Sequence, residues 1–157
     1  MTVRAEATRV VPATSQEVLE FVLDLERYRQ ADTKIGRVVP PIELDENDEG
    51  VTRYWGRMRG TPPAPDTNLV RLRRWSELTF TGAPRQPARL VVDFTGRFLC
   101  TDTDDGCRVT HGYELDFRRP FRWLYEPLLD GWLQTELEAE LDRVHAILSG
   151  VGRERPS

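Results

Sequence analysis

The stretch that decides the fold is residues 121–148, FRWLYEPLLDGWLQTELEAELDRVHAIL. In its second half apolar side chains recur at steps of four, four, three and four, at Leu133, Leu137, Leu141, Val144 and Leu148. This spacing places all five on one face of a helix. At about 1.5 Å per residue such a helix would be roughly 42 Å long, more than the width of a small domain. A β-sheet is the partner broad enough to lie beneath it.

The first half of the same stretch has a different pattern. Its apolar residues surround the helix axis almost completely: Phe121, Trp123, Leu124, Tyr125, Leu128, Leu129, Trp132 and Leu133. A helix that is apolar all round is expected where other elements cover it on several sides. We therefore expect this end to be buried, with Pro127 and Gly131 as places where the helix could kink.

The N-terminal segment predicts a strand followed by two short helices. Residues 3–11 alternate loosely and stop at Pro12. Thr14 and Glu17 have the spacing of a capping box, and apolar residues then follow at helical intervals. Residues 26–31 have room for one further helical turn.

The middle of the chain predicts an antiparallel meander. Alternating or β-rich runs are separated by Gly, Pro, Asn and Asp, the residues typical of turns. Pro40 and Pro41 confine the first run to a sheet edge, because neither can donate a ladder hydrogen bond. The runs are 35–44, 51–60, 69–75, 78–80, 88–101 and 109–117.

This order predicts an α+β helix-grip fold. About seven antiparallel strands would form a curved sheet wrapped around the long C-terminal helix, with the two short helices after the first strand. We expect residues 1–150 to form one domain, and residues 151–157 to form a flexible polar tail.

Three segments carry a family resemblance: ATRVVPATSQEVLEFVLDLERY (7–28), CRVTHGYELDFR (107–118) and the C-terminal stretch 121–148. With them the chain resembles the START/SRPBCC superfamily, the helix-grip proteins that include polyketide cyclases and lipid-transfer domains. Many members have a tryptophan shortly after the aromatic that matches Tyr28, whereas this chain reads RQADTKI. The resemblance implies a cavity between sheet and helix for an apolar or aromatic small molecule. It implies no single reaction, because one fold hosts several functions.

Strand parity selects the side chains that could line such a cavity. Tyr54 and Met58 are expected to face inward, with the arginines between and beside them in solvent. In the next strand Leu72 and Arg74 share the inward parity. An inward arginine needs an anionic partner, and the alternative is a bulge that places Arg74 in water.

The last two long strands contribute Phe94, Phe98, His111 and Tyr113 to the same face. A neutral imidazole at residue 111 could orient a ligand carbonyl or transfer a proton. The alternative is a core histidine whose hydrogen bonds are satisfied within the protein.

The C-terminal helix would contribute Leu128, Asp130 and Trp132. Counting about 100° per residue places Asp130 on the side of Leu137, so it either faces the cavity or the helix is offset at Gly131. Beside Arg74 or His111 it would be an acid-base group.

Composition and motifs exclude several functional classes. The net charge of −4 argues against general nucleic-acid binding, although arginines outnumber acidic residues between 51 and 97. The run TDTDDGC (101–107) lacks the spacing of a calcium loop, and no metal or nucleotide motif is present, so we expect no cofactor. Two cysteines and the lack of a long apolar run predict a cytoplasmic protein. Of the 22 basic residues only Lys34 is a lysine, so single arginines carry little functional weight in this chain.

Three functions remain open. The first is binding of a hydrophobic or aromatic small molecule, such as a polyketide, lipid or sterol-like compound, in the cavity. The second is a polyketide aromatase/cyclase or dehydratase, in which the polar groups assist enolisation and loss of water. The third is an interaction module that uses the basic outer sheet face with Trp55 and Trp75. The sequence predicts neither the oligomeric state nor the catalytic residues.

Overall fold

The computed structural model describes residues 2–39 and 42–154, and residues 151–154 by their backbone alone. Its elements run in the order β1 (Val3–Val11), α1 (Ser15–Leu23), α2 (Leu25–Tyr28), β2 (Ile35–Val38), β3 (Glu49–Gly56), β4 (Ala64–Arg73), β5 (Glu77–Gly82), the 3-10 turn η1 (Pro87–Leu90), β6 (Val92–Thr103), β7 (Gly106–Phe117), α3 (Phe121–Leu129) and α4 (Trp132–Glu154). In this part of the chain seven antiparallel strands form one sheet, ordered β1-β7-β6-β5-β4-β3-β2.

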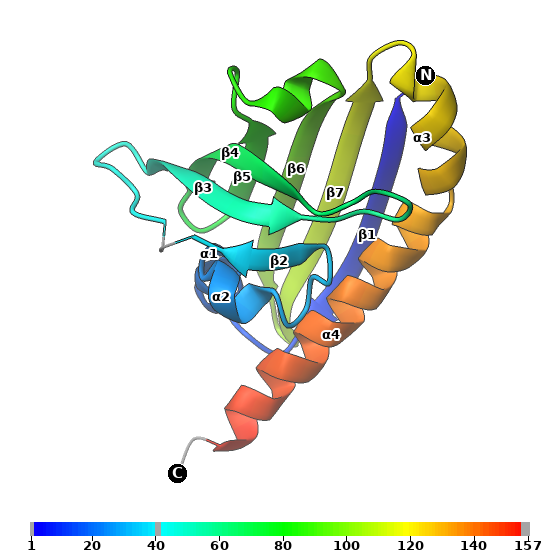
Figure 1. The fold of residues 1–157 in the computed structure, drawn as a ribbon. Helices are drawn as coiled ribbons and strands as arrows, with labels where there is room; N and C mark the ends of the chain where they lie inside the picture. Colours follow the sequence, from blue (N-terminus) through cyan, green and yellow to red (C-terminus); the bar gives the residue numbers. More distant parts are fainter. Residues whose placement is uncertain (1, 40–41, 155–157) are drawn as a thin grey trace.

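The sheet curls around α4, which runs diagonally along it beside β1 (Figure 1). Helices α1 and α2 pack at one end of the sheet, and α3 lies at the other. This is the predicted helix-grip arrangement, and the fold class is confirmed. Strand β2 lies at a sheet edge as expected, while Pro40 and Pro41 lie outside the described residues.

Local sequence signals explain the N-terminal elements. The Thr14 side chain accepts a hydrogen bond from the Glu17 backbone N–H at 3.1 Å and caps α1. The buried face of α1 then presents Val18, Phe21 and Val22. At its end Asp24 caps α2 in the same way, so two short helices form at an angle instead of one longer helix.

Burial alternates along the long hairpin β6–β7 as parity predicts. Cys107, Val109, His111, Leu115 and Phe117 are buried. Opposite them Phe98 pairs in register with His111. The inner face of this hairpin therefore belongs to the core, and α4 packs beside it mainly on β1, which pairs with β7.

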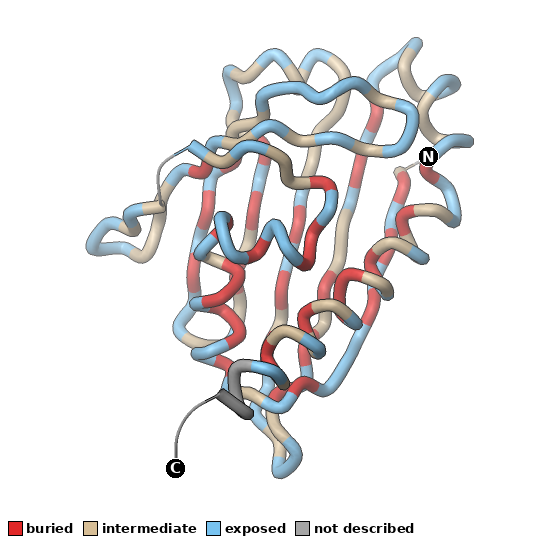
Figure 2. The backbone as a smooth tube through the Cα atoms, turned by 60° about the horizontal axis from the view of Figure 1, so that its bottom comes forward, coloured by how far each residue is buried: buried red, intermediate tan, exposed pale blue. Residues whose placement is uncertain are grey.

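The face of α4 predicted from the leucine spacing is the one that is buried. Leu133, Leu137, Leu141, Val144 and Leu148 are all 7% exposed or less. Along the tube of this helix buried and exposed positions alternate at the helical period (Figure 2). The helix continues to Glu154, into the segment assigned above to a polar tail.

The expectation that residues 121–133 form the covered end of one long helix is wrong. The helix breaks between Leu129 and Trp132, where Gly131 has φ +76°, a conformation that favours glycine. In α3 only Leu129 is fully buried, while Trp123 is 80% and Leu124 58% exposed. The all-round apolar pattern does not reveal that α3 covers the sheet with a single face.

A second correction concerns the strand predicted from residue 88. Residues 87–90 form η1, with Pro87 in its first turn, and β6 begins at Val92. Leu90 is consequently 75% exposed instead of facing the core. A proline at the start of a helical turn has the φ that the turn needs, and this local preference outweighs the alternating pattern.

No helix among the described residues is both long and apolar enough to cross a membrane.

We expect the packing of α4 against the sheet to contribute strongly to the free energy of unfolding. We expect Leu137→Ala to lower the free energy of unfolding by about 2–5 kcal/mol, because the side chain is fully buried and leaves a cavity. Leu124→Ala is the matched control in the exposed part of α3 and should change it by about 0.5 kcal/mol or less. Urea denaturation of both variants measures the difference, and equal losses would contradict this description of the helix.

Candidate functional site

A cavity of about 280 Å³ lies between the inner face of the sheet and α3, the first of the two C-terminal helices. Its walls come from β6 and β7, from α3, and from the loop between β3 and β4. The apolar part includes Met58, Val92, Leu115 and Leu129. The β3–β4 loop lies close to α3, since a Cβ added to Gly60 would be 3.1 Å from the Leu128 side chain. Loop and helix together form one end of the cavity.

Five aromatic rings line this cavity: Tyr54, Phe94, Tyr113, Phe117 and Tyr125. The Phe94 and Tyr113 ring centroids are 5.3 Å apart, and those of Phe117 and Tyr125 are 5.5 Å apart. Aromatic pairs at these distances hold each other in place. The lining therefore presents the faces and edges of packed aromatic rings, a surface suited to an apolar or aromatic molecule.

Two charged residues from the loop between α2 and β2 lie at the inner end of the cavity. The Lys34 ammonium is 2.8 Å from Asp32 Oδ1 and 5.1 Å from the centroid of the Tyr113 ring. The Tyr113 hydroxyl donates to Asp32 Oδ2 at 3.3 Å. All three residues also line the cavity, so a bound molecule would meet a donor and acceptor pair at this end.

Glu140 of α4 lies behind this pair and connects it to the helix. Its Oε2 accepts a hydrogen bond from the Lys34 ammonium at 2.9 Å, and its Oε1 accepts one from the Tyr28 hydroxyl. The carboxylate is completely buried. Burial by itself would raise the pKa of Glu140, but interaction with His111 and Lys34 lowers it to about 2.

The same cluster sets the charge of the cavity residues. Burial by itself would lower the pKa of Lys34, but the carboxylates of Asp32 and Glu140 raise it above its usual value. The pKa of Asp32 is raised, first by burial and then by the nearby Glu140. Lys34 is thus a fixed cation and not an amine nucleophile. The raised pKa brings the protonation of Asp32 closer to neutral pH than that of an ordinary aspartate.

His111 is buried behind the cavity wall and is not one of the residues that line the cavity. Its ring stacks on Phe98 with centroids 3.8 Å apart, and its Nδ1 lies 3.1 Å from the Arg97 carbonyl oxygen. Its Nε2 is 3.1 Å from Glu140 Oε1, an ion-pair distance when the ring is protonated, although the two are not aligned as a hydrogen bond. The residue contacts the charged cluster from behind, so the proposal that it contacts a ligand directly has no support in this geometry.

A second polar group lies on the cavity wall formed by β3 and β4. Asp66 Oδ2 accepts a hydrogen bond from the Tyr54 hydroxyl at 3.3 Å, and the Asn68 amide donates to the same hydroxyl at 3.0 Å. Burial raises the pKa of Asp66, and the hydrogen bonds from Tyr54, Gln86 and Asn68 offset this in part. This carboxyl lines the cavity.

The structure brings together four of the predicted site residues. Tyr54, Met58, Phe94 and Tyr113 line the cavity, and Phe98 lines a smaller adjoining pocket of about 30 Å³. The inward orientation of Tyr54, Phe94, Phe98 and Tyr113 follows from strand parity, whereas Met58 lies in the loop after β3. Contact of these residues with a ligand stays a prediction.

Five predicted residues lie elsewhere. Leu72 is buried in the core, Trp132 packs against the core at the start of α4, and Leu128 is 36% exposed. Asp130 is exposed because it is the C-cap of α3, just where the helix breaks. Arg74 follows the end of β4, where strand alternation no longer applies, and forms an ion pair with Asp48 at 2.8 Å. Of the two alternatives that the sequence leaves open for each residue, Arg74 therefore takes the one in solvent and Asp130 the one with an offset helix, and the inward placement of both is wrong.

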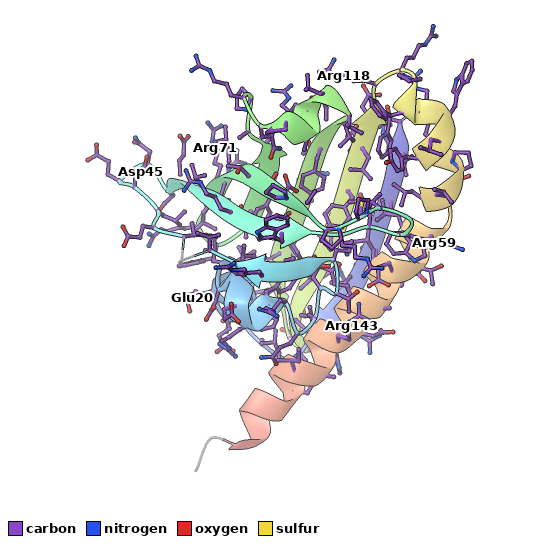
Figure 3. All side chains as sticks on the ribbon, viewed as in Figure 1. Glu20, Asp45, Arg59, Arg71, Arg118 and Arg143 are labelled. Carbon is purple, nitrogen blue, oxygen red and sulfur yellow. The ribbon has the colours of Figure 1, made fainter. Side chains whose placement is uncertain are left out.

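The outer sheet face is less basic than the sequence suggests. Arg71 pairs with Glu49 at 2.8 Å and Arg73 lies 3.9 Å from Glu77. Arg71 and Arg59 project from the surface as separate side chains (Figure 3). Paired, solvated arginines of this kind favour a polar surface over a phosphate-binding one.

Sequence reasoning missed Asp32, Lys34, Asp66 and Glu140. For Glu140 a signal exists, because it lies three residues after Leu137 and four before Val144, on the apolar stripe of α4. A charged residue on such a stripe needs a partner. Asp32 and Lys34 lie in RQADTKI, the segment that departs from the superfamily pattern. Asp66 carries no signal, since it follows a proline-rich loop.

The sequence matches one family model, described as "Polyketide cyclase / dehydrase and lipid transport", over residues 2–148. The chain belongs to this family. The match confirms the resemblance to the START/SRPBCC superfamily. A comparison with curated proteins finds no match.

Solved structures share the family fold. TTHA0849 from Thermus thermophilus has a TM-score of 0.72 and 17% identity, with 96% of this chain and 99% of that chain covered. The Zhui aromatase/cyclase from Streptomyces sp. R1128 has a TM-score of 0.72 and 14% identity, covering 95% and 94%. The lipid transfer and protein localization domain of human StarD13 has a TM-score of 0.63 and 19% identity, covering 90% and 74%. Identities this low establish the fold alone.

Glu140 should stabilise the protein only while it is ionised. We expect Glu140→Gln to lower the free energy of unfolding at pH 7 by about 3–5 kcal/mol, because Lys34 loses one of its two buried partners. The folded pKa of about 2 is below the usual 4.5, so the stability from ionised Glu140 is lost as pH falls from 4.5 towards 2. The deficit of the variant should therefore be smaller at pH 3.

Urea denaturation at both pH values measures this change. Glu138→Gln is the matched control, since Glu138 is exposed on the same helix, and should change stability by about 0.5 kcal/mol or less. An equal deficit for Glu140→Gln at pH 7 and pH 3 would show that its charge is not the stabilising feature.

Proposed function

We propose that the protein binds a hydrophobic or aromatic small molecule, of the polyketide or lipid kind, in the cavity between the sheet and α3. The observation that carries this proposal is the cavity itself, with five aromatic rings around about 280 Å³. The family description, which names polyketide cyclisation and lipid transport, supports it. A cytoplasmic location is part of the proposal, supported by the low cysteine content.

The affinity would come from apolar contact. Each square ångström of apolar surface removed from water contributes about 25 cal/mol. The volume is slightly below the roughly 300–1,000 Å³ usual for ligand pockets, which favours a compact molecule or a single alkyl chain over a large sterol. Asp32, Lys34 and Asp66 would orient its polar end.

Filling the cavity should block binding. We expect Val92→Trp to raise the dissociation constant for 1-decanol at least about tenfold, because Val92 lines the cavity and the indole would occupy it. Val10→Trp is the matched control on an exposed strand position and should bind 1-decanol normally. Isothermal titration calorimetry measures both, with thermal unfolding to verify the fold. If Val92→Trp binds 1-decanol as wild type does, the ligand lies elsewhere.

Chain length gives a second readout of the same site. The wild-type protein should bind 1-decanol more tightly than 1-octanol by about tenfold or more, since each buried methylene contributes about 0.8 kcal/mol. A much weaker dependence would indicate surface association.

One observation favours an enzymatic alternative. Asp32, whose pKa is raised, and Tyr113, which donates to it, both face the cavity beside the Lys34 ammonium. A carboxyl and a phenol in this arrangement can exchange a proton with a β-keto compound, and the ammonium can stabilise the developing enolate. The group acting as acid or base would then be Asp32 and not His111.

Tyr113→Phe tests this alternative. If the protein cyclises or dehydrates a poly-β-keto substrate, the variant should lower kcat about 100-fold or more while the dissociation constant of 1-decanol changes by about twofold or less. The phenyl ring retains the packing, so only the hydroxyl is lost. Turnover that is unaffected by this substitution would remove Tyr113 from the mechanism.

A further inference from the structure

The carboxylates around the cavity differ in whether a cation faces them. Asp32 and Glu140 share the Lys34 ammonium at 2.8 and 2.9 Å. Asp66 is half-buried and is held by neutral groups, the Tyr54 hydroxyl at 3.3 Å and the Asn68 and Gln86 side chains. Within the described residues no lysine or arginine lies at ion-pair distance from it. A carboxylate in this setting lacks the countercharge that its counterparts have.

The other charged residues around the cavity do not supply a countercharge for Asp66. Lys34 is already paired with two carboxylates, Asp32 and Glu140, so its ammonium is not available to Asp66. Arg57 lines the cavity but is exposed to solvent at its edge. A negatively charged ligand group would therefore enter a region already rich in acceptors, and a positively charged one would be attracted.

The aromatic walls complete the pattern. Tyr54 belongs to the Asp66 hydrogen-bond group itself, and Phe94, Tyr113, Phe117 and Tyr125 line the same space. Ring faces attract ammonium groups, most strongly where water is excluded. Aromatic rings together with one uncompensated carboxylate form the usual chemistry of a site for an organic cation, whereas a neutral ligand would need only the rings.

We propose that the cavity selects hydrophobic amines, with the ammonium group of the ligand at Asp66 and its apolar part among the aromatic rings. This inference rests on the proposed function, since it names the chemical class that the same cavity takes. It assigns Asp66 as the residue that determines specificity.

Three ligands with one ten-carbon chain test the proposal: decylamine, 1-decanol and decanoate, each below its micelle concentration at pH 7.5. In isothermal titration calorimetry we expect wild-type protein to bind decylamine at least about tenfold more tightly than 1-decanol, and decanoate more weakly than both. Asp66→Asn, which preserves the shape of the side chain, should weaken decylamine binding about tenfold and change 1-decanol binding by about twofold or less.

Asp105→Asn is the matched control. It removes the same charge from the exposed β6–β7 turn, at the opposite end of the sheet from α3 (Figure 1), whose residues line the cavity, and should leave all three affinities unchanged. Thermal unfolding of each variant verifies that it is folded, and the wild-type ligand series needs no variant at all.

The outcomes separate the two proposals. If 1-decanol or decanoate binds as tightly as decylamine, or if Asp66→Asn weakens every ligand equally, the amine inference is overturned while the cavity remains a binding site. If none of the three ligands binds, hydrophobic binding in the cavity fails as well.

Discussion

The structure depends on one buried ion-pair network that joins the C-terminal helix to the opposite side of the fold. Glu140 on α4 contacts the Lys34 ammonium at 2.9 Å, and Lys34 in turn contacts Asp32 at 2.8 Å. Removing such charges from water is costly, and only close pairing with further hydrogen bonds offsets the cost. The Tyr28 and Tyr113 hydroxyls donate those hydrogen bonds, to Glu140 and Asp32, and His111 Nε2 lies 3.1 Å from Glu140 Oε1. The network constrains the α2–β2 loop to one position relative to the helix.

A neighbouring contact reinforces this connection. Arg143 lies one helical turn from Glu140, and its side chain reaches from α4 towards the α2–β2 loop (Figure 3). There its guanidinium donates to the Ala31 carbonyl at 2.6 Å. Because the loop is held at two points, Asp32 and Lys34 are fixed where they line the cavity. The polar end of the cavity is thus preorganised, and its apolar end is formed by α3 and the β3–β4 loop.

Much of the fold could be predicted because the signals are local and periodic. The capping box at Thr14, the leucine stripe of α4 and the alternation along β6–β7 each depend on residues a few positions apart. The same parity placed Tyr54, Phe94 and Tyr113 inward. Where periodicity ends, the sequence either left the direction of a side chain open or predicted it wrongly. Arg74 follows the last residue of a strand, Leu90 lies in a helical turn, and Asp130 lies at the break between α3 and α4. At each of these positions the direction of a side chain depends on a turn and not on a repeat.

The order of the elements, the curved sheet with its covering helix and the faces that meet between them can be read from the sequence, because hydrophobic period is a property of neighbouring residues. Which polar groups share the interior depends on the three-dimensional fold. Asp32 and Glu140 are more than a hundred positions apart, and the strand register that brings Asp66 opposite Tyr54 depends on the β3–β4 connection. Charge compensation acts through space, so the chain's order alone does not reveal that Lys34 balances two carboxylates while Asp66 has no cationic partner among the described residues.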